Sequence, residues 1–227
     1  MEERVSIIEG EEPAIIVAPH GADEPHTGAV AEAIAEALEC YAVINRGWER
    51  SDSVDWENDQ ANCNHIEHCL EHIVRQEFLD PIGNFVTQLE KHFYGIYVFY
   101  IHGVGFTGKT KPDVVIGYGA GDPARLTCDI WRKDALLWHL VDVGMDAYQG
   151  KPGGLYSAHD RRNMTQYFRR REHNDVVHSM QIEVSKEWRE DEEDARDTGE
   201  ILAKAIEKVI DLGDEGFTTN GFQIMEY

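Results

Sequence analysis

The stretch Ile15-Ile16-Val17-Ala18-Pro19-His20-Gly21-Ala22-Asp23-Glu24-Pro25-His26-Thr27-Gly28 carries the strongest fold signal in the chain. A short apolar run followed by Pro and Gly indicates a buried strand that ends in a turn. In open α/β sheets, ligands bind in the crevice outside the carboxyl ends of the strands. This turn holds His20, Asp23, Glu24 and His26, whose side chains can bind metals. The stretch therefore predicts an α/β fold with a polar site; the alternative is a loop whose histidines only make local hydrogen bonds.

The segments around this stretch alternate between strand and helix patterns. Residues 14–18 are followed by apolar residues at helical spacing over 28–39, and 41–44 indicates a second short strand. Residues 96–101 are β-branched or aromatic throughout, as expected for a central strand buried on both faces. Further strands are predicted over 113–117 and 176–184, and helices over 65–78, 82–92, 131–143 and 201–210, with Pro81 separating the first two helices.

This alternation predicts the fold class and the domain organisation. We expect an α/β fold with a central mixed β-sheet flanked by helices, in the phosphorylase/hydrolase-like arrangement. The length of 227 residues suits one sizeable core, so residues 1–227 are expected to form a single domain. The stretch 51–64 is polar and has no apolar period, which indicates a polar insertion in that domain.

Composition excludes several classes of partner. The chain has 43 acidic and 21 basic residues, and its formal net charge of -22 repels nucleic acid and anionic membranes. The first residues lack the features of a signal peptide, and no apolar run has the length of a membrane span. Four cysteines at irregular spacings predict free thiols in a reducing compartment. We therefore expect a cytoplasmic protein with a small-molecule partner.

Two strand ends supply a set of metal-ligating side chains. His20 and Glu24 follow the first strand, and His102 follows the strand at 96–101. Catalytic zinc characteristically takes three protein ligands from His, Asp and Glu and keeps one position open. These three residues meet that count and predict one zinc ion per chain. Asp23 competes with Glu24 as the carboxylate ligand, and His26 could replace either residue; spacing alone leaves these alternatives open.

Two further positions fit the chemistry of amide hydrolysis. Bound zinc lowers the pKa of water to about 7 and polarises a carbonyl group, and a general base must then accept a proton. Glu183, on the late predicted strand, is the candidate base. Asn45 and Arg46 follow the strand at 41–44, and an arginine fork matches a carboxylate, so they are candidate substrate ligands. The alternative is a structural Arg46 paired with one of the many acidic residues.

Six short motifs carry a resemblance to a known family. Together they extend over most of residues 14–190 and occur in the order seen in the N-formylglutamate amidohydrolase family: Pro19-His20-Gly21, Val43-Ile44-Asn45-Arg46, Ile101-His102-Gly103, Pro112-Asp113-Val114-Val115-Ile116-Gly117, Gly153-Gly154 and Gln181-Ile182-Glu183. The segment 20–27 also resembles the zinc loop of phage poly-γ-glutamate hydrolases. Family members usually carry aspartates where this chain has Val43 and Tyr100, so the surroundings of the ligands differ here.

The resemblance implies a zinc-dependent amidohydrolase, related also to aspartoacylase-like and carboxypeptidase-like enzymes. In this interpretation His20, Glu24 and His102 bind zinc, Glu183 is the base, and Asn45-Arg46 binds a substrate carboxylate. The expected reaction is cleavage of the amide bond of an N-acyl amino acid such as N-formylglutamate. One alternative is hydrolysis of poly-γ-glutamate or γ-glutamyl peptides, and another is a non-catalytic metal-binding interaction module. Candidates for polarising the scissile carbonyl are Arg50, Arg161 and Arg162.

Overall fold

The strands of the computed structural model form one mixed sheet. The structure describes residues 3–107, 111–170 and 175–213. Within them, seven strands pair in the order β1-β3-β2-β4-β7-β5-β6. Their bounds are β1 (Val5–Ile8), β2 (Glu12–Ala18), β3 (Cys40–Asn45), β4 (Ile96–Val104), β5 (Val114–Gly117), β6 (Ala147–Gln149) and β7 (Val177–Ser185).

The centre of the sheet is parallel. Strands β3, β2, β4 and β7 run in the same direction, whereas β1 is antiparallel to β3 and β5 is antiparallel to β7. This arrangement confirms the predicted α/β class with a mixed sheet. It also brings the carboxyl ends of β2, β4 and β7 to one edge of the sheet. The edge strands β1 and β6, of four and three residues, were not predicted.

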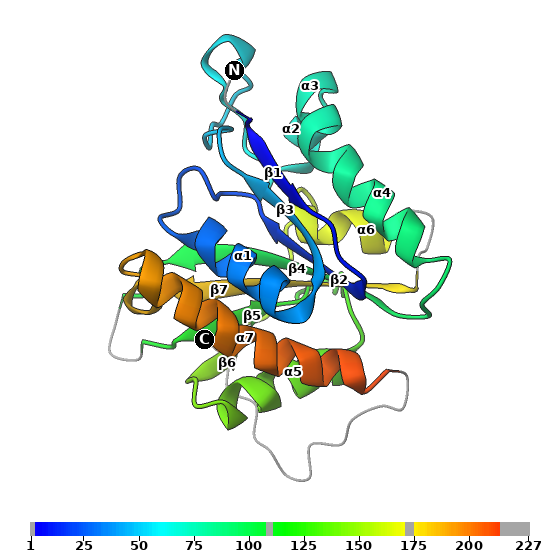
Figure 1. The fold of residues 1–227 in the computed structure, drawn as a ribbon, viewed down its shortest axis with the longest axis vertical. Helices are drawn as coiled ribbons and strands as arrows, with labels where there is room; N and C mark the ends of the chain where they lie inside the picture. The colour runs from blue at the N-terminus through cyan, green and yellow to red at the C-terminus, as the bar shows by residue number, and fades with distance from the viewer. Residues whose placement is uncertain (1–2, 108–110, 171–174, 214–227) are drawn as a thin grey trace.

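Helices cover both faces of this sheet (Figure 1). Helices α1, α5 and α7 pack on one face, and α4 and α6 pack on the other. No described helix is long and apolar enough to cross a membrane. The helix bounds are α1 (Thr27–Leu38), α2 (Ile66–Cys69), α3 (His72–Val74), α4 (Asp80–Leu89), α5 (Ile130–Asp142), α6 (Tyr167–Arg170) and α7 (Glu192–Asp211).

Strand β4 joins the two halves of the core. Phe99 and Ile101 face the cluster that includes α1, α5 and α7, whereas Val98 and Tyr100 face the cluster that includes α4. Successive side chains of a strand point to opposite faces, so a central strand is buried on both sides, as predicted for 96–101. The strand continues to Val104, three residues beyond the prediction. His102 therefore lies within a paired strand, and pairing fixes the direction of its side chain.

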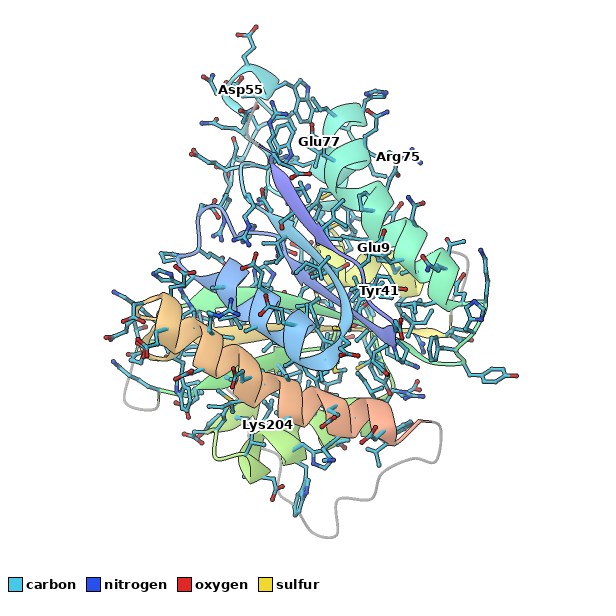
Figure 2. The ribbon with its side chains drawn as sticks, viewed as in Figure 1. Glu9, Tyr41, Asp55, Arg75, Glu77 and Lys204 are labelled. Atoms are coloured by element: carbon cyan, nitrogen blue, oxygen red, sulfur yellow. The ribbon has the colours of Figure 1, made fainter. Side chains whose placement is uncertain are left out.

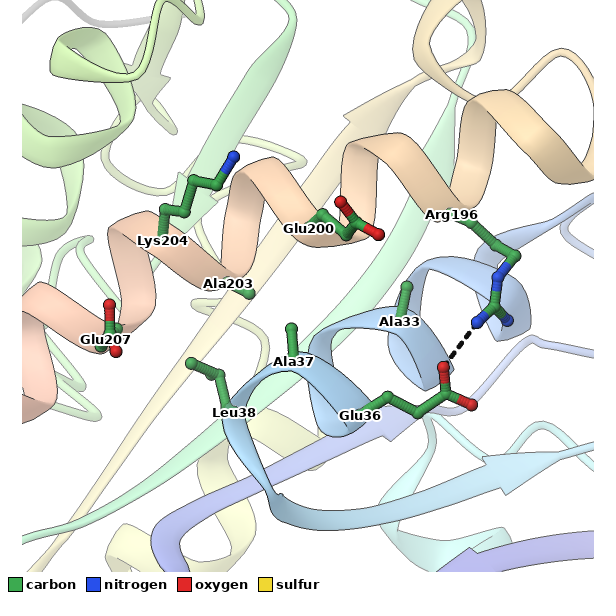
Figure 3. Close-up of a pocket in the computed structure, with 9 residues that line it drawn as sticks. All are labelled: Ala33, Glu36, Ala37, Leu38, Arg196, Glu200, Ala203, Lys204 and Glu207. Carbon is green, nitrogen blue, oxygen red and sulfur yellow. Dashed lines mark hydrogen bonds and ion pairs between the residues drawn. The ribbon is translucent and has the colours of Figure 1, made fainter.

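Helices α1 and α7 approach each other closely. A Cβ atom at Gly199 of α7 would lie 2.5 Å from Ala33 Cβ and 2.7 Å from the Val30 carbonyl oxygen of α1, so only glycine fits this contact. Figure 3 shows the groove along the two helices, with an ion pair of 2.5 Å between Arg196 and Glu36. Glutamates from both helices line the groove.

The predicted helix break at Pro81 is a change of helix type in the structure. Helix α3, a π-helical turn over Arg75–Leu79 and α4 follow one another without a gap. Pro81 lies in the first turn of α4. Proline cannot donate a backbone hydrogen bond and its ring crowds the preceding turn, and the wider π-turn before it relieves that crowding. The helical path therefore continues to Leu89 instead of ending before Pro81.

The polar excursion at 51–64 leaves the sheet and returns to it. Its regular structure is one 3₁₀ turn over Trp56–Asn58, where the Asp55 side chain accepts a hydrogen bond from Asn58 N. Asp55 lies near the tip drawn at the top of Figure 2. On the return, Ala61 and Cys63 are fully buried. The end of the excursion is thus part of the core, and it places Asn62 beside His20 in the loop after β2.

Candidate metal centre

His20, Glu24 and His102 come together at the carboxyl ends of β2 and β4. These two strands are parallel neighbours, so the loop after β2 meets the end of β4. One ligand atom from each of the three side chains lies within 4.8 Å of the others. In the described part of the chain this is the one group of at least three such residues. We call these three residues the candidate metal centre.

Asn62 determines which nitrogen of His20 faces this centre. Asn62 Oδ1 accepts a hydrogen bond from Asn64 N at 3.0 Å and lies 2.9 Å from His20 Nε2. Because this oxygen only accepts, neutral His20 carries its proton on Nε2 and presents the lone pair of Nδ1. Nδ1 lies 2.9 Å from Glu24 Oε1, which is a second acceptor. A cation placed between these two acceptor atoms would interact favourably with both of them.

Arg50 supplies a positive charge at that point in this structure. Its Nη2 lies 2.5 Å from His20 Nδ1 and donates to Glu24 Oε1. The Arg50 side chain is 46% exposed, so it can withdraw into solvent when another cation binds. Its backbone N donates to Asp23 Oδ2 at 2.5 Å, which keeps the start of the excursion against the β2 loop. The contacts of Arg50 therefore support a cation site between His20 and Glu24.

His102 and Glu24 complete the donor set. Gly103 N donates to Glu24 Oε2 at 2.8 Å, and His102 Nδ1 lies 3.5 Å from the same oxygen. His102 Nε2 is buried and has no hydrogen-bond partner among the described residues. Burying an imidazole nitrogen without a hydrogen-bond partner costs free energy. Binding of a metal ion would satisfy this nitrogen, and neutral imidazole is the commonest metal ligand. Two imidazoles and one carboxylate form a donor set that suits zinc with one open position, so the residues present fit this metal.

The structure distinguishes Glu24 from Asp23 and His26, the two other candidate metal ligands that the sequence left open. Asp23 points to the backbone of Arg50 and is not a member of the centre. His26 precedes α1 as its N-cap residue, with φ 64°, and is also outside the group. Glu24 is the carboxylate that reaches both histidines. The ligand roles themselves remain predictions.

Charge is concentrated at this centre. Burial alone would raise the pKa of Glu24, but the neighbouring His102 and His20 hold it well below its usual range. Burial alone would lower the pKa of His102, but the bond with Glu24 and the charge of Glu183 raise it. Glu24 is therefore ionised at neutral pH. A proton and a metal ion compete for His102, as is general for histidine ligands.

Glu183 lies next to His102 across two parallel strands. The pairing of β4 with β7 sets the two residues in register, and Glu183 is 8% exposed. Gln181 Nε2 donates to Glu183 Oε1 at 2.5 Å. Burial raises the pKa of Glu183, although the charge of His102 opposes the rise. A carboxylate with a raised pKa is a better proton acceptor near neutral pH, which suits a general base.

Arg189 is a buried residue near the centre that sequence analysis missed. Its Nη1 donates to the Pro25 carbonyl oxygen at 2.6 Å, and its Nε donates to the Val184 carbonyl oxygen at 3.3 Å. A Cβ atom at Gly103 would lie 2.3 Å from Arg189 Cζ, so glycine makes room for the guanidinium. Arg189 thus joins the loop of Glu24 to the end of β7. Arg189 lies in the charged stretch 187–197, and charged residues are usually exposed, yet Arg189 is 4% exposed.

Two other residues near the site differ in how far the sequence could reveal them. Gln181 stands two residues before Glu183, so strand alternation puts both side chains on the same face. That spacing could have identified Gln181. Asn62 contacts His20 from 42 positions away, inside the polar excursion, and no local pattern signals this contact.

The structure places the Asn45 amide in a turn. Asn45 Nδ2 donates to the carbonyl oxygens of Pro19 at 2.8 Å and Trp48 at 2.6 Å. Its Oδ1 accepts from Gly47 N at 3.2 Å and Trp48 N at 2.8 Å. The side chain is fully buried. These four bonds use both donors and both acceptor positions, so the amide stabilises the chain after β3.

The neighbouring Arg46 side chain lies along α1. Its Nη2 forms an ion pair with Glu32, and its Nη1 would lie 2.6 Å from a Cβ atom at Gly28. The structure therefore does not bring the Arg46 guanidinium to the candidate metal centre. The predicted Asn45-Arg46 clamp stays a prediction, and the contacts of both residues favour structural roles.

The fold matches several solved structures, at low sequence identity. A gene product from Agrobacterium tumefaciens has a TM-score of 0.64 and 14% identity, covering 92% of this chain and 95% of that chain. An N-formylglutamate amidohydrolase from Ralstonia eutropha has a TM-score of 0.62 and 11% identity, covering 94% and 99%. A bacteriophage poly-γ-glutamate hydrolase has a TM-score of 0.53 and 14% identity, covering 92% and 89%. No protein-family model and no curated protein matches the sequence.

These likenesses concern the arrangement of the chain in space. The fold is shared, over most of the length of both chains, with structures named as an N-formylglutamate amidohydrolase and a poly-γ-glutamate hydrolase. The resemblance to the N-formylglutamate amidohydrolase family, inferred from ordered short motifs, is therefore confirmed at the level of the fold. At 11% to 14% identity, a shared fold leaves the reaction and the substrate to be argued from the site.

Proposed function

We propose that this protein is a zinc-dependent amidohydrolase that cleaves the amide bond of an N-acyl amino acid such as N-formylglutamate. The observation that carries the proposal is the register of Glu183 beside His102, at an edge where two histidines and one carboxylate converge. The fold shared with a solved N-formylglutamate amidohydrolase supports this assignment. One zinc ion per chain would be held by His20, Glu24 and His102.

Each residue around the centre has a separate role in amide hydrolysis. Zinc, when bound, polarises the scissile carbonyl and increases the acidity of water. Glu183 accepts the proton of the attacking water at its carboxylate and delivers it to the leaving amine. Gln181 holds one oxygen of Glu183, which aims the other oxygen. Arg189 fixes the loop of Glu24 relative to the end of β7.

Arg50 is the best placed of the three arginines considered for stabilising the developing oxyanion. It already contacts two residues of the centre, and its side chain is partly exposed and can move. A guanidinium near a polarised carbonyl stabilises negative charge that develops in the transition state. Arg162 instead forms an ion pair with Asp160.

A second candidate function is hydrolysis of poly-γ-glutamate or γ-glutamyl peptides. It is favoured by the fold shared with the phage poly-γ-glutamate hydrolase and by the Glu24-Pro25 pair that follows His20. The chemistry at the centre would be the same, because both substrate classes present an amide bond beside carboxylates. A metal-binding module without turnover is the remaining alternative.

The test is turnover by the zinc-loaded protein on N-formylglutamate, on other N-acyl amino acids and on γ-glutamyl peptides. We expect turnover that falls by roughly 10² to 10⁴ in Glu183→Gln, the usual contribution of a positioned base, with zinc retained. Glu187→Gln is the matched control, since Glu187 is exposed and bonds to Ser185 and Lys111. Turnover on γ-glutamyl peptides alone would select the second candidate. Absence of turnover on every substrate, with zinc bound, would leave the binding module.

A further inference from the structure

A series of hydrogen bonds joins the candidate base to a backbone group on another segment. Thr165 N donates to Asn163 Oδ1 at 2.8 Å, and Asn163 Nδ2 donates to Gln181 Oε1 at 2.9 Å. Gln181 Nε2 then donates to Glu183 Oε1 at 2.5 Å. We call these three bonds the Asn163 network. Asn163 stands 18 positions before Gln181, so the network depends on the tertiary fold.

The first bond of the Asn163 network decides the direction of the other two. A side-chain amide presents an accepting oxygen on one side and a donating NH2 group on the other. The backbone N–H of Thr165 can only donate, so Asn163 must turn its oxygen to Thr165 and its NH2 group to Gln181. Gln181 must then turn its oxygen to Asn163 and its NH2 group to Glu183. Glu183 therefore receives a donor because of a backbone group two side chains away.

This direction suits a carboxylate that has to accept a proton. An ionised carboxylate can only accept hydrogen bonds, and the NH2 group of Gln181 donates one to Glu183. With the Gln181 amide reversed, its oxygen would face Glu183 Oε1, and two acceptors repel each other unless a proton lies between them. A proton held there would keep Glu183 from taking one from water. The orientation of Gln181 thus bears directly on the role of Glu183 as a base.

Both amides of the Asn163 network are held in place. Asn163 is the N-cap residue of the 3₁₀ turn Met164–Gln166, and its backbone N donates to the Asp160 carbonyl oxygen at 2.9 Å. Gln181 lies in the paired strand β7 and is 3% exposed. Water can satisfy either orientation of an exposed amide, whereas an amide buried this deeply depends on its protein partners. These partners therefore decide which way the Gln181 amide points.

We propose that Asn163 is a positioning residue, which orients the amide of Gln181 and thereby keeps Glu183 able to accept a proton. The inference rests on the proposed function, because it takes Glu183 as the general base. Asn163 acts through Gln181 and does not itself contact Glu183. The strand alternation that relates Gln181 to Glu183 gives no indication of Asn163, which reaches them from the turn before α6.

The isosteric change Asn163→Asp reverses the expected orientation, and NMR of the zinc-free protein can detect it without turnover. Aspartate caps a helical turn as well as asparagine does, but it offers an acceptor on both sides. Gln181 should then turn its NH2 group toward the new carboxylate. We expect Overhauser contacts from the Gln181 Nε2 protons to the Glu183 methylene protons in wild type, and their loss in Asn163→Asp. Gln181→Met identifies the Gln181 signals by removing them.

Kinetics of the zinc-loaded protein test the consequence for the reaction. We expect Asn163→Asp to lower kcat by about tenfold or more, the effect of losing a charge-assisted hydrogen bond. Asn163→Ser, which keeps a capping oxygen and adds no charge, should lower kcat by less. Asn84→Asp is the matched control: it adds the same charge at an exposed position of α4 and should leave kcat unchanged.

A double-variant cycle separates orientation from the added charge. In a Gln181→Met background there is no amide to turn, so Asn163→Asp should change kcat by less than about twofold. An equal loss of kcat with and without Gln181→Met would overturn the inference, as would Overhauser contacts to Glu183 that persist in a folded Asn163→Asp. Loss of these contacts in a protein that turns over no substrate would support the orienting role of Asn163 and refute the hydrolase proposal.

Discussion

The candidate metal centre and the turn at Asn45-Arg46 both lie at strand ends of the same sheet, but their polar atoms are bonded in opposite ways. At the centre, acceptors from His20 and Glu24 converge, and one buried nitrogen of His102 has no partner among the described residues. At the turn, each donor and acceptor position of Asn45 is used by nearby backbone.

This difference shows how to separate a functional site from a structural one when both have suitable residue types. A satisfied buried amide contributes to stability and has no capacity left for a ligand. Converging acceptors and an unpartnered imidazole are costly unless something binds there. Residues at the centre should therefore govern metal binding and turnover, whereas a change at Asn45 should affect stability and a change at Arg46 should have little effect on either.

The largest expected effect is the loss of zinc on removal of a histidine at the centre. We expect His20→Ala and His102→Ala to fall from about one zinc per chain to almost none, since three ligands are the usual minimum for such a site. Elemental analysis of the purified proteins measures this. His26→Ala is the control and should keep its zinc, because His26 lies at the N-cap position of α1, outside the candidate metal centre. Zinc retained in both ligand variants would contradict the assigned centre.

The next effect is a pH dependence set by Glu183. Its pKa is raised by burial, so turnover should increase by about tenfold per pH unit below that pKa and level off above it. The same shift acts on stability. The burial cost is absent below the usual carboxyl pKa of 4.5 and is fully present once the buried group is ionised. At pH 7, Glu183→Gln should therefore raise the Tm of the zinc-free protein. A lower Tm in this variant would contradict the burial argument.

A smaller effect, on stability alone, is expected for Asn45→Ala. The change removes four hydrogen bonds and leaves buried backbone groups unpaired. We expect a loss of about 2 to 4 kcal/mol in the free energy of unfolding, measured with urea. Asn58→Ala, which removes the exposed side-chain bond from Asn58 Nδ2 to Asp55 Oδ2, should cost less than about 1 kcal/mol. Loss of zinc in a folded Asn45→Ala would show that the turn is not separate from the centre.

The smallest effect is expected for Arg46→Ala. The ion pair of Arg46 with Glu32 is partly exposed, and such pairs contribute about 0 to 1 kcal/mol. We expect the KM for N-formylglutamate to change by less than about twofold, because a group bonded elsewhere adds little to substrate binding. Steady-state kinetics checks this. An increase in KM of more than about tenfold would instead support the clamp predicted from the sequence.

Much of the fold could be predicted from local sequence patterns. The strands at β2, β3, β4, β5 and β7 and the helices α1, α5 and α7 lie where periodicity predicted them, within a few residues at most ends. The start of α7 is an exception: the helix begins at Glu192, nine residues earlier than predicted, within the charged stretch 187–197. There Asp191 caps the helix and acidic residues follow in the first turn, where they interact favourably with the helix dipole.

The sequence by itself determined which side chains lie near the carboxyl ends of the strands, namely His20, His102 and Glu183, because strand periodicity and the turn residues after a strand are local properties. Tertiary structure alone decided which of them meet and what else reaches them. Glu24 rather than Asp23 faces both histidines, Asn62 returns from the excursion to orient His20, and Arg46 is held by α1. These outcomes depend on strand register and on packing between segments far apart in the chain, which local patterns do not encode.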